Sequence, residues 1–345
     1  MDAINPRFQK KPAASLDPAA LVENLRQGSR AALSQALTLV ESRLPAHREK
    51  AEAVVEAALP HTGKSLRVGI TGVPGVGKST FIESFGEYLI ERQDKRLAVL
   101  AIDPSSARTR GSILGDKTRM EKLAQNERAF IRPSPAAGSL GGTARKTRES
   151  ILLCEAAGYD LVMVETVGVG QSETAVKSMV DFFMLLMLAT AGDELQGIKR
   201  GIMEMADLLV INKADDPENR DVRMAVGEYK RALHLFPPNP NEWIPQVKAA
   251  SGLKGKGLEA VWESMEAFEN QQRLKGYLAE NRAQQAEQWL EQSFEQLLLE
   301  EVEARPAFRK RYAELRARVR AGEKAPSRAA RELVKLVSPS VSGPS

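Results

Sequence analysis

Cysteine and histidine are scarce in this sequence, and their scarcity excludes several kinds of metal site. Cys154 is the only cysteine among 345 residues, so the chain can form neither an internal disulfide nor a cluster of thiolate ligands. The three histidines, His47, His61 and His234, lie far apart in the sequence. Proteins that deliver nickel or zinc typically use paired cysteines or a histidine-rich stretch. This chain contains neither.

Long hydrophobic runs are also lacking. The longest, Phe182 to Ala189, is far shorter than the ~18 residues that a membrane-spanning helix requires, and it is typical of a buried strand. The N-terminal residues MDAINPRFQKK contain no apolar core of a secretion signal. We therefore expect a cytoplasmic protein that has no membrane partner.

Charge of one sign is not in large excess. The net charge is only +4, and basic residues are interspersed with acidic ones rather than gathered in one long run. Nucleic-acid-binding proteins usually carry a stronger basic patch. We therefore expect no nucleic-acid partner.

The distribution of helical and strand-like segments divides the chain into four parts, because a chain of this length is too long for one small core. We expect an N-terminal helical extension over 1–62, an α/β domain over 63–268, a C-terminal helical extension over 269–337 and a disordered tail over 338–345. The C-terminal extension carries an apolar stripe, which usually packs into a core and less often forms a subunit interface. Its members are Leu274, Tyr277, Leu278, Trp289, Leu290, Phe294, Leu297, Leu298 and Val302.

Short apolar runs alternate with longer helical segments in the α/β domain, which is typical of a parallel sheet with crossover helices. Most of these runs are continuously apolar, as in strands that are covered on both faces. We therefore expect a mostly parallel central sheet flanked by helices. Its expected strands are Leu66–Thr71, Leu97–Asp103, Ala129–Arg132, Asp160–Thr166, Phe182–Ala189, Asp207–Asn212 and Ile244–Ala250.

A phosphate-binding loop follows the first of these strands. The segment matches G-x-x-x-x-G-K-[ST] between a strand and a helix that we expect to begin at Thr80, which is the context that this motif requires. Its glycines let backbone N–H groups point inward at a helix N-terminus and form an anion site. We expect Lys78 to reach the β- and γ-phosphates and Ser79 to give its hydroxyl to Mg²⁺. The nucleotide-binding residues of this P-loop NTPase are expected to be Gly72, Val73, Pro74, Gly75, Val76, Gly77, Lys78, Ser79 and Thr80.

A second motif, Asn212-Lys-Ala-Asp215, follows a later strand and resembles the NKxD motif of GTPases. The Asp215 carboxylate can accept hydrogen bonds from N1–H and the 2-amino group of guanine, which adenine does not offer in that form. We expect Asn212 to bridge to the phosphate loop and the stem of Lys213 to cover the base. A last guanine-contacting loop is expected at Ser251, Gly252 and Leu253. The sequence therefore predicts GTP and GDP as ligands.

Two acids end strands on the side of the sheet where ligands bind in such folds. Glu165 is followed by Gly168, whose N–H could contact the γ-phosphate. We expect Glu165 to hold Mg²⁺ or to orient an attacking water. Asp103 is either a Mg²⁺ or water-orienting acid or a cap for the turn formed by Pro104 and the serines after it.

Several further stretches identify a family resemblance. Asp103–Ser106, Gly111–Met120, Gly168–Thr174 and Gly192–Lys199, together with glutamate at position 165 where most GTPases have aspartate, resemble the MeaB/ArgK family. This family belongs to the metallochaperone-type group of P-loop GTPases, and the resemblance covers about residues 17–335. It implies a GTP-hydrolysing chaperone that gates cobalamin loading and protects an adenosylcobalamin-dependent methylmalonyl-CoA mutase. It also implies a homodimer formed through the C-terminal extension.

The resemblance assigns roles to residues in three loops. It implies that Asp116 lies in a first switch that moves onto Mg²⁺, and that Gln171 lies in a second switch. It further implies that Lys199, in a charged third switch, neutralises charge in the transition state. A departure from the family pattern is Leu188–Ala191, where relatives commonly carry proline and glycine.

Three other functions are compatible with parts of the sequence. A nickel-delivery GTPase of the same group would need metal ligands that are missing here. An ATP-using kinase or transport-associated ATPase conflicts with the guanine motif. A nucleotide-dependent binding module with negligible hydrolysis remains open, because catalytic assistance can come from a partner.

Overall fold

The computed structural model describes residues 17–42, 44–103, 120–135, 140–166, 172–189, 200–216 and 218–337. The chain divides after Gln285 into two compact units. This boundary separates two compact groups of contacts and does not test where functional domains begin or end. The four-part division expected from the sequence therefore stays a prediction.

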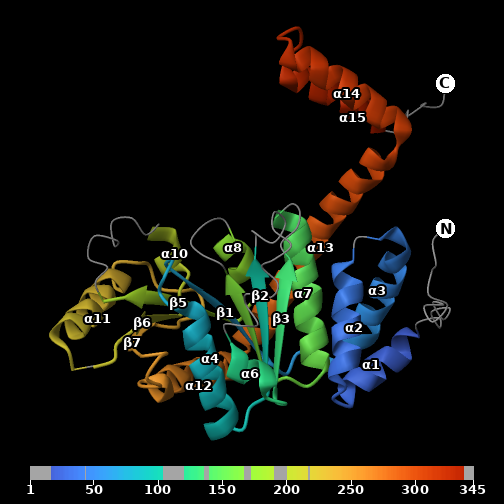
Figure 1. Ribbon diagram of the computed structural model, residues 1–345. Helices are drawn as coiled ribbons and strands as arrows, with labels where there is room; N and C mark the ends of the chain where they lie inside the picture. Colours follow the sequence, from blue (N-terminus) through green and yellow to red (C-terminus); the bar gives the residue numbers. More distant parts are fainter. Residues whose placement is uncertain are drawn as a thin grey trace, which may run out of the picture. The chain divides into compact units, whose positions relative to one another are not determined.

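The first unit is built around one sheet, shown in Figure 1. Within the described residues seven strands lie in the order β3-β2-β4-β1-β5-β6-β7, and every pair of neighbouring strands is parallel. This confirms the α/β class and the parallel sheet. The strands are β1 Leu66–Gly72, β2 Leu97–Asp103, β3 Ala129–Pro135, β4 Leu161–Thr166, β5 Phe182–Leu188, β6 Leu208–Asn212 and β7 Gln246–Ala249.

Strand boundaries differ from the expected ones for identifiable reasons. Asp160 and Asp207 each precede their strand, because their carboxylates accept hydrogen bonds from the backbone N–H groups of Arg96 at 2.7 Å and Phe183 at 2.8 Å. The last strand begins at Gln246, after Pro245, which has no N–H for the ladder. β1 and β3 run one and three residues beyond their expected ends, and β5 and β7 stop one residue short of theirs. The expected strands are nevertheless all present, because continuous apolar runs mark strands that are buried on both faces.

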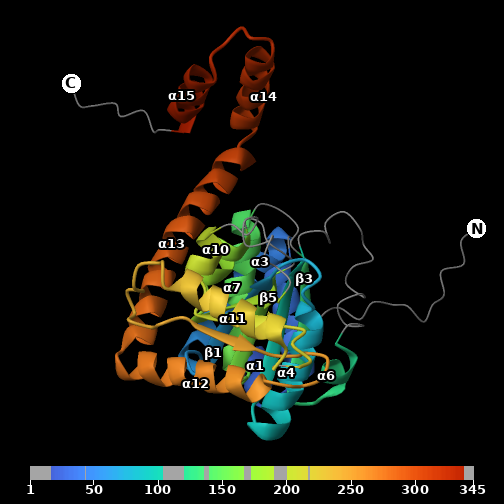
Figure 2. The same ribbon diagram turned by 90° about the vertical axis from the view of Figure 1, so that its left-hand side faces the viewer.

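Helices cover both faces of the sheet. The crossovers from β1 to β2 and from β4 to β5 run in opposite directions, so right-handed connections place their helices on opposite faces. Figure 2 shows α4, α6 and α12 along one face. This face carries α4 Lys78–Arg92, α6 Glu121–Gln125 and α12 Leu258–Leu274, and the other carries α7 Leu140–Ala156, α8 Ser172–Lys177 and α11 Arg220–Leu233. A short helix, α10 Arg200–Glu204, precedes β6.

The N-terminal helices pack against α7 (Figure 1). Asp17 caps the first helix by accepting a hydrogen bond from the N–H of Ala19 at 3.0 Å, with Pro18 as the first helical residue. Pro45 begins the third helix and so separates it from the second, as expected. These helices are α1 Pro18–Arg26, α2 Arg30–Glu41 and α3 Pro45–Ala58, followed by the short 3₁₀ helix η2 Leu59–His61.

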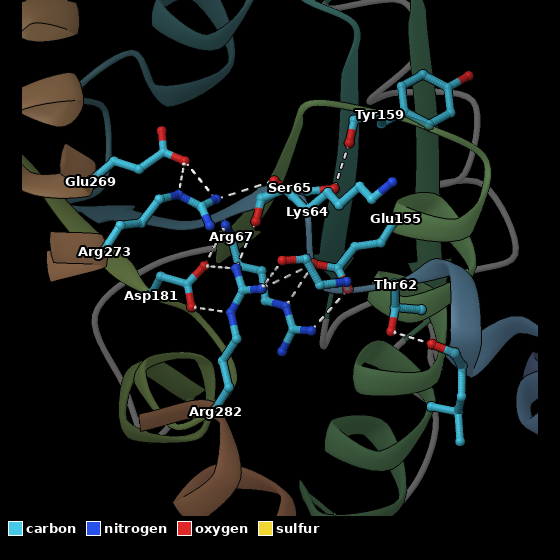
Figure 3. A network of polar contacts seen from close by, with 12 residues as sticks. Thr62, Lys64, Ser65, Arg67, Glu155, Tyr159, Asp181, Glu269, Arg273 and Arg282 are labelled. Atoms are coloured by element: carbon cyan, nitrogen blue, oxygen red, sulfur yellow. Dashed lines mark hydrogen bonds and ion pairs between the residues drawn. The ribbon is translucent and has the colours of Figure 1, made fainter. Parts of the chain in front are cut away.

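A polar network at the amino ends of β1 and β5 holds the beginning of α13 (Tyr277–Ala304) on the first unit, as Figure 3 shows. Arg282 donates to both carboxylate oxygens of Asp181, at 2.8 and 2.5 Å, and to the carbonyl oxygens of Gly63 and Ser65. Glu155, whose side chain is fully buried, accepts two hydrogen bonds from Arg67. The network therefore joins α7, α13, the start of β1 and the two connections that precede β1 and β5, which are far apart in sequence.

The second unit contains the rest of α13 and a hairpin of α14 (Pro306–Arg320) and α15 (Pro326–Val337). Several members of the apolar stripe are exposed, including Leu290 at 71% and Phe294 at 64%. The expectation that this stripe belongs to a core is therefore wrong for these residues. Leu278, in the first unit, and Val302 are buried.

None of the helices in the described ranges has the length and apolar character needed to cross a bilayer.

Candidate functional site

The phosphate loop connects β1 to α4. Gly75 and Gly77 have φ angles of 76° and 88°, in the left-handed region that favours glycine. Gly77 is the N-cap of α4, so the helix begins at Lys78 and not at Thr80 as expected. The correction has a simple cause: the positive φ of Gly77 turns the chain directly into the helix, and Lys78, Ser79 and the exposed Thr80 form its first turn.

Close packing with β5 fixes the start of the loop. A Cβ atom on Gly72 would lie 2.6 Å from the carbonyl oxygen of Leu186, so only glycine fits here. Val73 and Val76 are buried, whereas Pro74 and Gly75 are exposed. The loop is thus held by two apolar side chains while its middle faces solvent.

Lys78 lies inside the loop. Its side-chain ammonium donates to the carbonyl oxygen of Gly72 at 3.0 Å, and the residue is 9% exposed. Burial lowers the pKa of Lys78, and the negative charges of Glu165 and Glu173 oppose that shift. The negative charge of a bound polyphosphate would therefore pair with a largely buried ammonium.

Ser79 and Glu165 bring two oxygen ligands together beside the loop. The Ser79 hydroxyl, in the first turn of α4, donates to Oε1 of Glu165 in β4 at 3.2 Å. Mg²⁺ prefers oxygen ligands and commonly takes one or two from protein, with substrate phosphates and waters completing its shell. A hydroxyl and a carboxylate at this separation fit such an ion. No cluster of three or more His, Cys, Asp or Glu side chains suited to a metal exists among the described residues.

Glu173, in α8, is a residue of this site that the sequence did not single out. It is 1% exposed, and its charge acts on Lys78. Its motif, Gly168–Thr174, pointed to a switch segment, but one acid in a short polar run gives no sign of burial. Only the packing of α8 against β1 and β4 shows where this carboxylate lies.

The guanine motif is attached to the phosphate loop by Asn212. Its side-chain amide donates to the carbonyl oxygen of Val76 at 2.8 Å, and its Oδ1 accepts from the N–H of Gly252 at 3.0 Å. The amide is 3% exposed, so both bonds are protected from water. One side chain thus joins the end of β6, the phosphate loop and the loop after β7.

Asp215 is exposed, and its carboxylate is oriented by its neighbours. Oδ1 accepts from the Ser251 hydroxyl at 2.6 Å, and the Asp215 carbonyl oxygen accepts from the Lys256 ammonium at 2.8 Å. Lys213 has a φ of 60° and is exposed, as is Leu253 at 72%. The arrangement leaves the second carboxylate oxygen of Asp215 available to a ligand.

The remaining sequence-predicted site residues cannot be placed in this geometry. Asp103 ends β2, and its side chain lies outside the described part of the chain. Asp116, Gly168 and Lys199 also lie outside the described residues, as does Gln171. The described site therefore comprises the phosphate loop, Glu165, Glu173, and the two loops that follow β6 and β7.

Comparison with known proteins identifies the family that shares this arrangement. The chain matches the family model of the methylmalonyl-CoA mutase-associated GTPase MeaB over residues 33–307. The chain belongs to the MeaB family. This confirms the resemblance seen in the sequence, and it makes the chain a P-loop GTPase that binds guanine nucleotides.

Relatives of this chain are found in bacteria and animals. GTPase ArgK of Escherichia coli is 47% identical over 316 residues, which cover 92% of this chain and 95% of that protein. The mouse methylmalonic aciduria type A homolog, mitochondrial, is 46% identical over 325 residues, covering 91% and 78%. A crystal structure of a LAO/AO transport system kinase is 40% identical, with a TM-score of 0.73 and coverage of 95% of this chain and 99% of that one.

Proposed function

We propose that this GTPase is a chaperone of an adenosylcobalamin-dependent methylmalonyl-CoA mutase, which uses GTP hydrolysis to gate cobalamin loading and to protect the mutase. The observation that carries the proposal is the match to the family of mutase-associated GTPases over most of the chain. The mouse relative named for methylmalonic aciduria supports the same partner.

The site supports specific roles for its residues. Lys78 binds the β- and γ-phosphates, with the N–H groups of the phosphate loop around them. Asp215 accepts hydrogen bonds from guanine. Asn212 bonds to Val76 and so fixes the distance between the loop of Asp215 and the phosphate loop. Together these residues bind GTP at the carboxyl ends of the strands, where parallel sheets typically hold ligands.

Ser79 and Glu165 would hold Mg²⁺, with Asp103 and Asp116 as further candidates from the sequence. When bound, this ion would neutralise charge on the phosphates. Glu165 also remains a candidate to orient the attacking water, and Gly168 a candidate to contact the γ-phosphate. Lys199 is proposed to supply positive charge to the transition state when the partner is bound.

A homodimer is part of the proposal. The second unit exposes large apolar side chains at a spacing of four residues on α13, namely Leu290, Phe294 and Leu298, which therefore share one face of the helix. Such a continuous apolar surface is typical of an interface, because water contact with it is unfavourable.

GTP turnover with and without purified mutase tests the proposal. We expect the mutase to raise the rate, and we expect transfer of adenosylcobalamin to the apo-mutase to require GTP. Lys199→Ala should keep its affinity for GDP but lose the stimulation by the mutase. A turnover rate that no acyl-CoA mutase changes would contradict the chaperone function.

The same measurements separate the alternatives. A single-turnover rate near zero even with the mutase would indicate a binding module without hydrolysis. Turnover of ATP at the rate of GTP would indicate the ATP-using alternative and would also contradict the role of Asp215.

A further inference from the structure

The loop that follows β7 lies against the helix that follows the phosphate loop. A Cβ atom on Gly252 would lie 2.7 Å from Cα and 3.0 Å from the backbone nitrogen of Phe81, so the two backbones approach as closely as glycine allows. At this contact the Ser84 hydroxyl donates to the carbonyl oxygen of Gly252. A serine in a helix commonly bonds a carbonyl of the preceding turn, whereas Ser84 bonds a residue 168 positions away.

This contact closes a ring of hydrogen bonds around the nucleotide site. The N–H of Gly252 donates to Asn212, and Asn212 donates to Val76 in the phosphate loop. The phosphate loop continues into α4, which carries Ser84, and the N–H of Phe81 donates to the carbonyl oxygen of Gly77. The phosphate loop and the loop after β7 are therefore held at two separate points.

The position of Gly252 also sets the position of the base-reading carboxylate. Ser251, its neighbour, donates to Oδ1 of Asp215 at 2.6 Å and accepts from the N–H of Lys254 at 3.0 Å. Because Asp215 is exposed, few other contacts orient its carboxylate. A shift of Gly252 away from α4 moves Ser251 and thereby turns the carboxylate.

We propose that Ser84 is a positioning residue for base selection, which holds the loop of Ser251 and Gly252 against α4 so that Asp215 faces the base. Ser84 touches no part of the nucleotide in this role. The inference rests on the proposed recognition of guanine by Asp215, and it adds a residue that lies outside the two nucleotide-binding motifs of this chain.

The test uses two substitutions that disturb the contact from opposite sides. Ser84→Ala removes the hydroxyl, and Gly252→Ala adds a Cβ that must push the loop from Phe81. Ser84→Thr keeps the hydroxyl and serves as the conservative variant. Glu91→Ala, on an exposed position of the same helix, is the matched control. Calorimetry measures the Kd of each full-length protein for GDP, IDP, ADP and pyrophosphate, and thermal unfolding is recorded alongside.

Ser84→Ala should weaken GDP binding about fivefold, the loss expected for one hydrogen bond of about 1 kcal/mol. IDP lacks the 2-amino group, so its affinity should fall less and the ratio of GDP to IDP affinity should shrink. Pyrophosphate affinity should stay unchanged, because it does not use the base loop. Gly252→Ala should change the ratios in the same direction, and Ser84→Thr and Glu91→Ala should match the unchanged protein.

Equal weakening of GDP and pyrophosphate in Ser84→Ala would overturn the inference, because the serine would then support the phosphate loop or the fold. A full guanine preference retained by Ser84→Ala would also overturn it, and would leave the role of Asp215 intact. Equal affinities of the unchanged protein for GDP and ADP would refute the proposed guanine recognition itself, and this inference with it.

Discussion

Lys78 shows how a single charged side chain is kept ready for a ligand. Burying an ammonium is unfavourable unless it is paired, and here the carbonyl oxygen of Gly72 and the charges of Glu165 and Glu173 stabilise it. Because burial lowers the pKa of Lys78, the ammonium loses its proton at a lower pH than an exposed lysine does. Phosphate affinity should therefore fall as the pH rises toward that pKa.

Lys78→Ala should weaken GDP binding about 100-fold, because it removes a charge-assisted contact with the phosphates. Equilibrium dialysis with labelled GDP measures the loss, and Lys50→Ala, an exposed lysine on α3, is the control. Tight GDP binding by Lys78→Ala would contradict the assignment of this loop.

Asp215→Asn should relax the preference for guanine, because an amide can accept only one of the two hydrogen bonds that guanine offers to the carboxylate. We expect GDP affinity to fall by about 10-fold or more while pyrophosphate affinity is kept. Competition of GDP, ADP and pyrophosphate for the site measures this. An unaltered preference for GDP over ADP would show that base recognition lies elsewhere.

At the scale of helices and strands, the contacts at the two ends of the sheet have different tasks. The carboxyl ends carry the nucleotide loops, whereas the amino ends of β1 and β5 carry the polar network of Figure 3. Arg282 of α13 forms an ion pair with Asp181 and donates hydrogen bonds to two backbone carbonyl oxygens there. Its side chain is 14% exposed. A buried ion pair adds little net stability over apolar groups, but loss of one partner leaves an uncompensated charge.

Arg282→Met should therefore lower the free energy of unfolding by about 3–5 kcal/mol, measured by urea denaturation followed by circular dichroism. Arg26→Met, which breaks an exposed pair with Glu23, should cost at most about 1 kcal/mol. Adding Asp181→Asn to Arg282→Met should recover part of the loss, since the unpaired charge is then gone. A loss as small as that of Arg26→Met would show that the network carries little stability.

For the whole molecule, the net charge is small, but acidic and basic residues of the second unit lie in different segments. Every charged residue from 286 to 304 is a glutamate, whereas basic residues strongly outnumber acidic ones from 305 to 337. Within the hairpin, ion pairs engage its glutamates with Arg311, Arg318 and Lys324. Further basic residues lie along the same hairpin, among them Lys310, Arg316, Arg320, Arg328, Arg331 and Lys335.

Opposite charges that gather on different segments of one chain favour association between copies at low salt. If the proposed homodimer pairs the acidic segment of one copy with the basic hairpin of the other, its Kd should rise about tenfold between 50 and 500 mM KCl. Sedimentation velocity measures this. Arg316→Glu combined with Arg320→Glu should weaken the dimer at 50 mM KCl and have little effect at 500 mM. A dimer of unchanged Kd under all these conditions would indicate that only its apolar contacts matter.

Local sequence patterns predicted much of this protein. The parallel sheet followed from continuous apolar runs, because strands between two helical layers have no polar face. The phosphate loop followed from glycines, a lysine and a serine at short spacing, and the family from longer motifs that the comparisons confirm. The roles of the individual site residues, the domain boundaries, the partner and the cytoplasmic location stay predictions.

The features that the sequence by itself determined are thus ones that depend on neighbours along the chain: the parallel strands, the phosphate loop and the family motifs. Tertiary structure alone decided the features that depend on residues far apart: the burial of Glu173, the exposure of Leu290 and Phe294, and the contact between Ser84 and Gly252. The physical reason is that burial and hydrogen bonding at a given position depend on which surface packs against it. The spacing of residues within one helix or loop does not show which surface will pack against it.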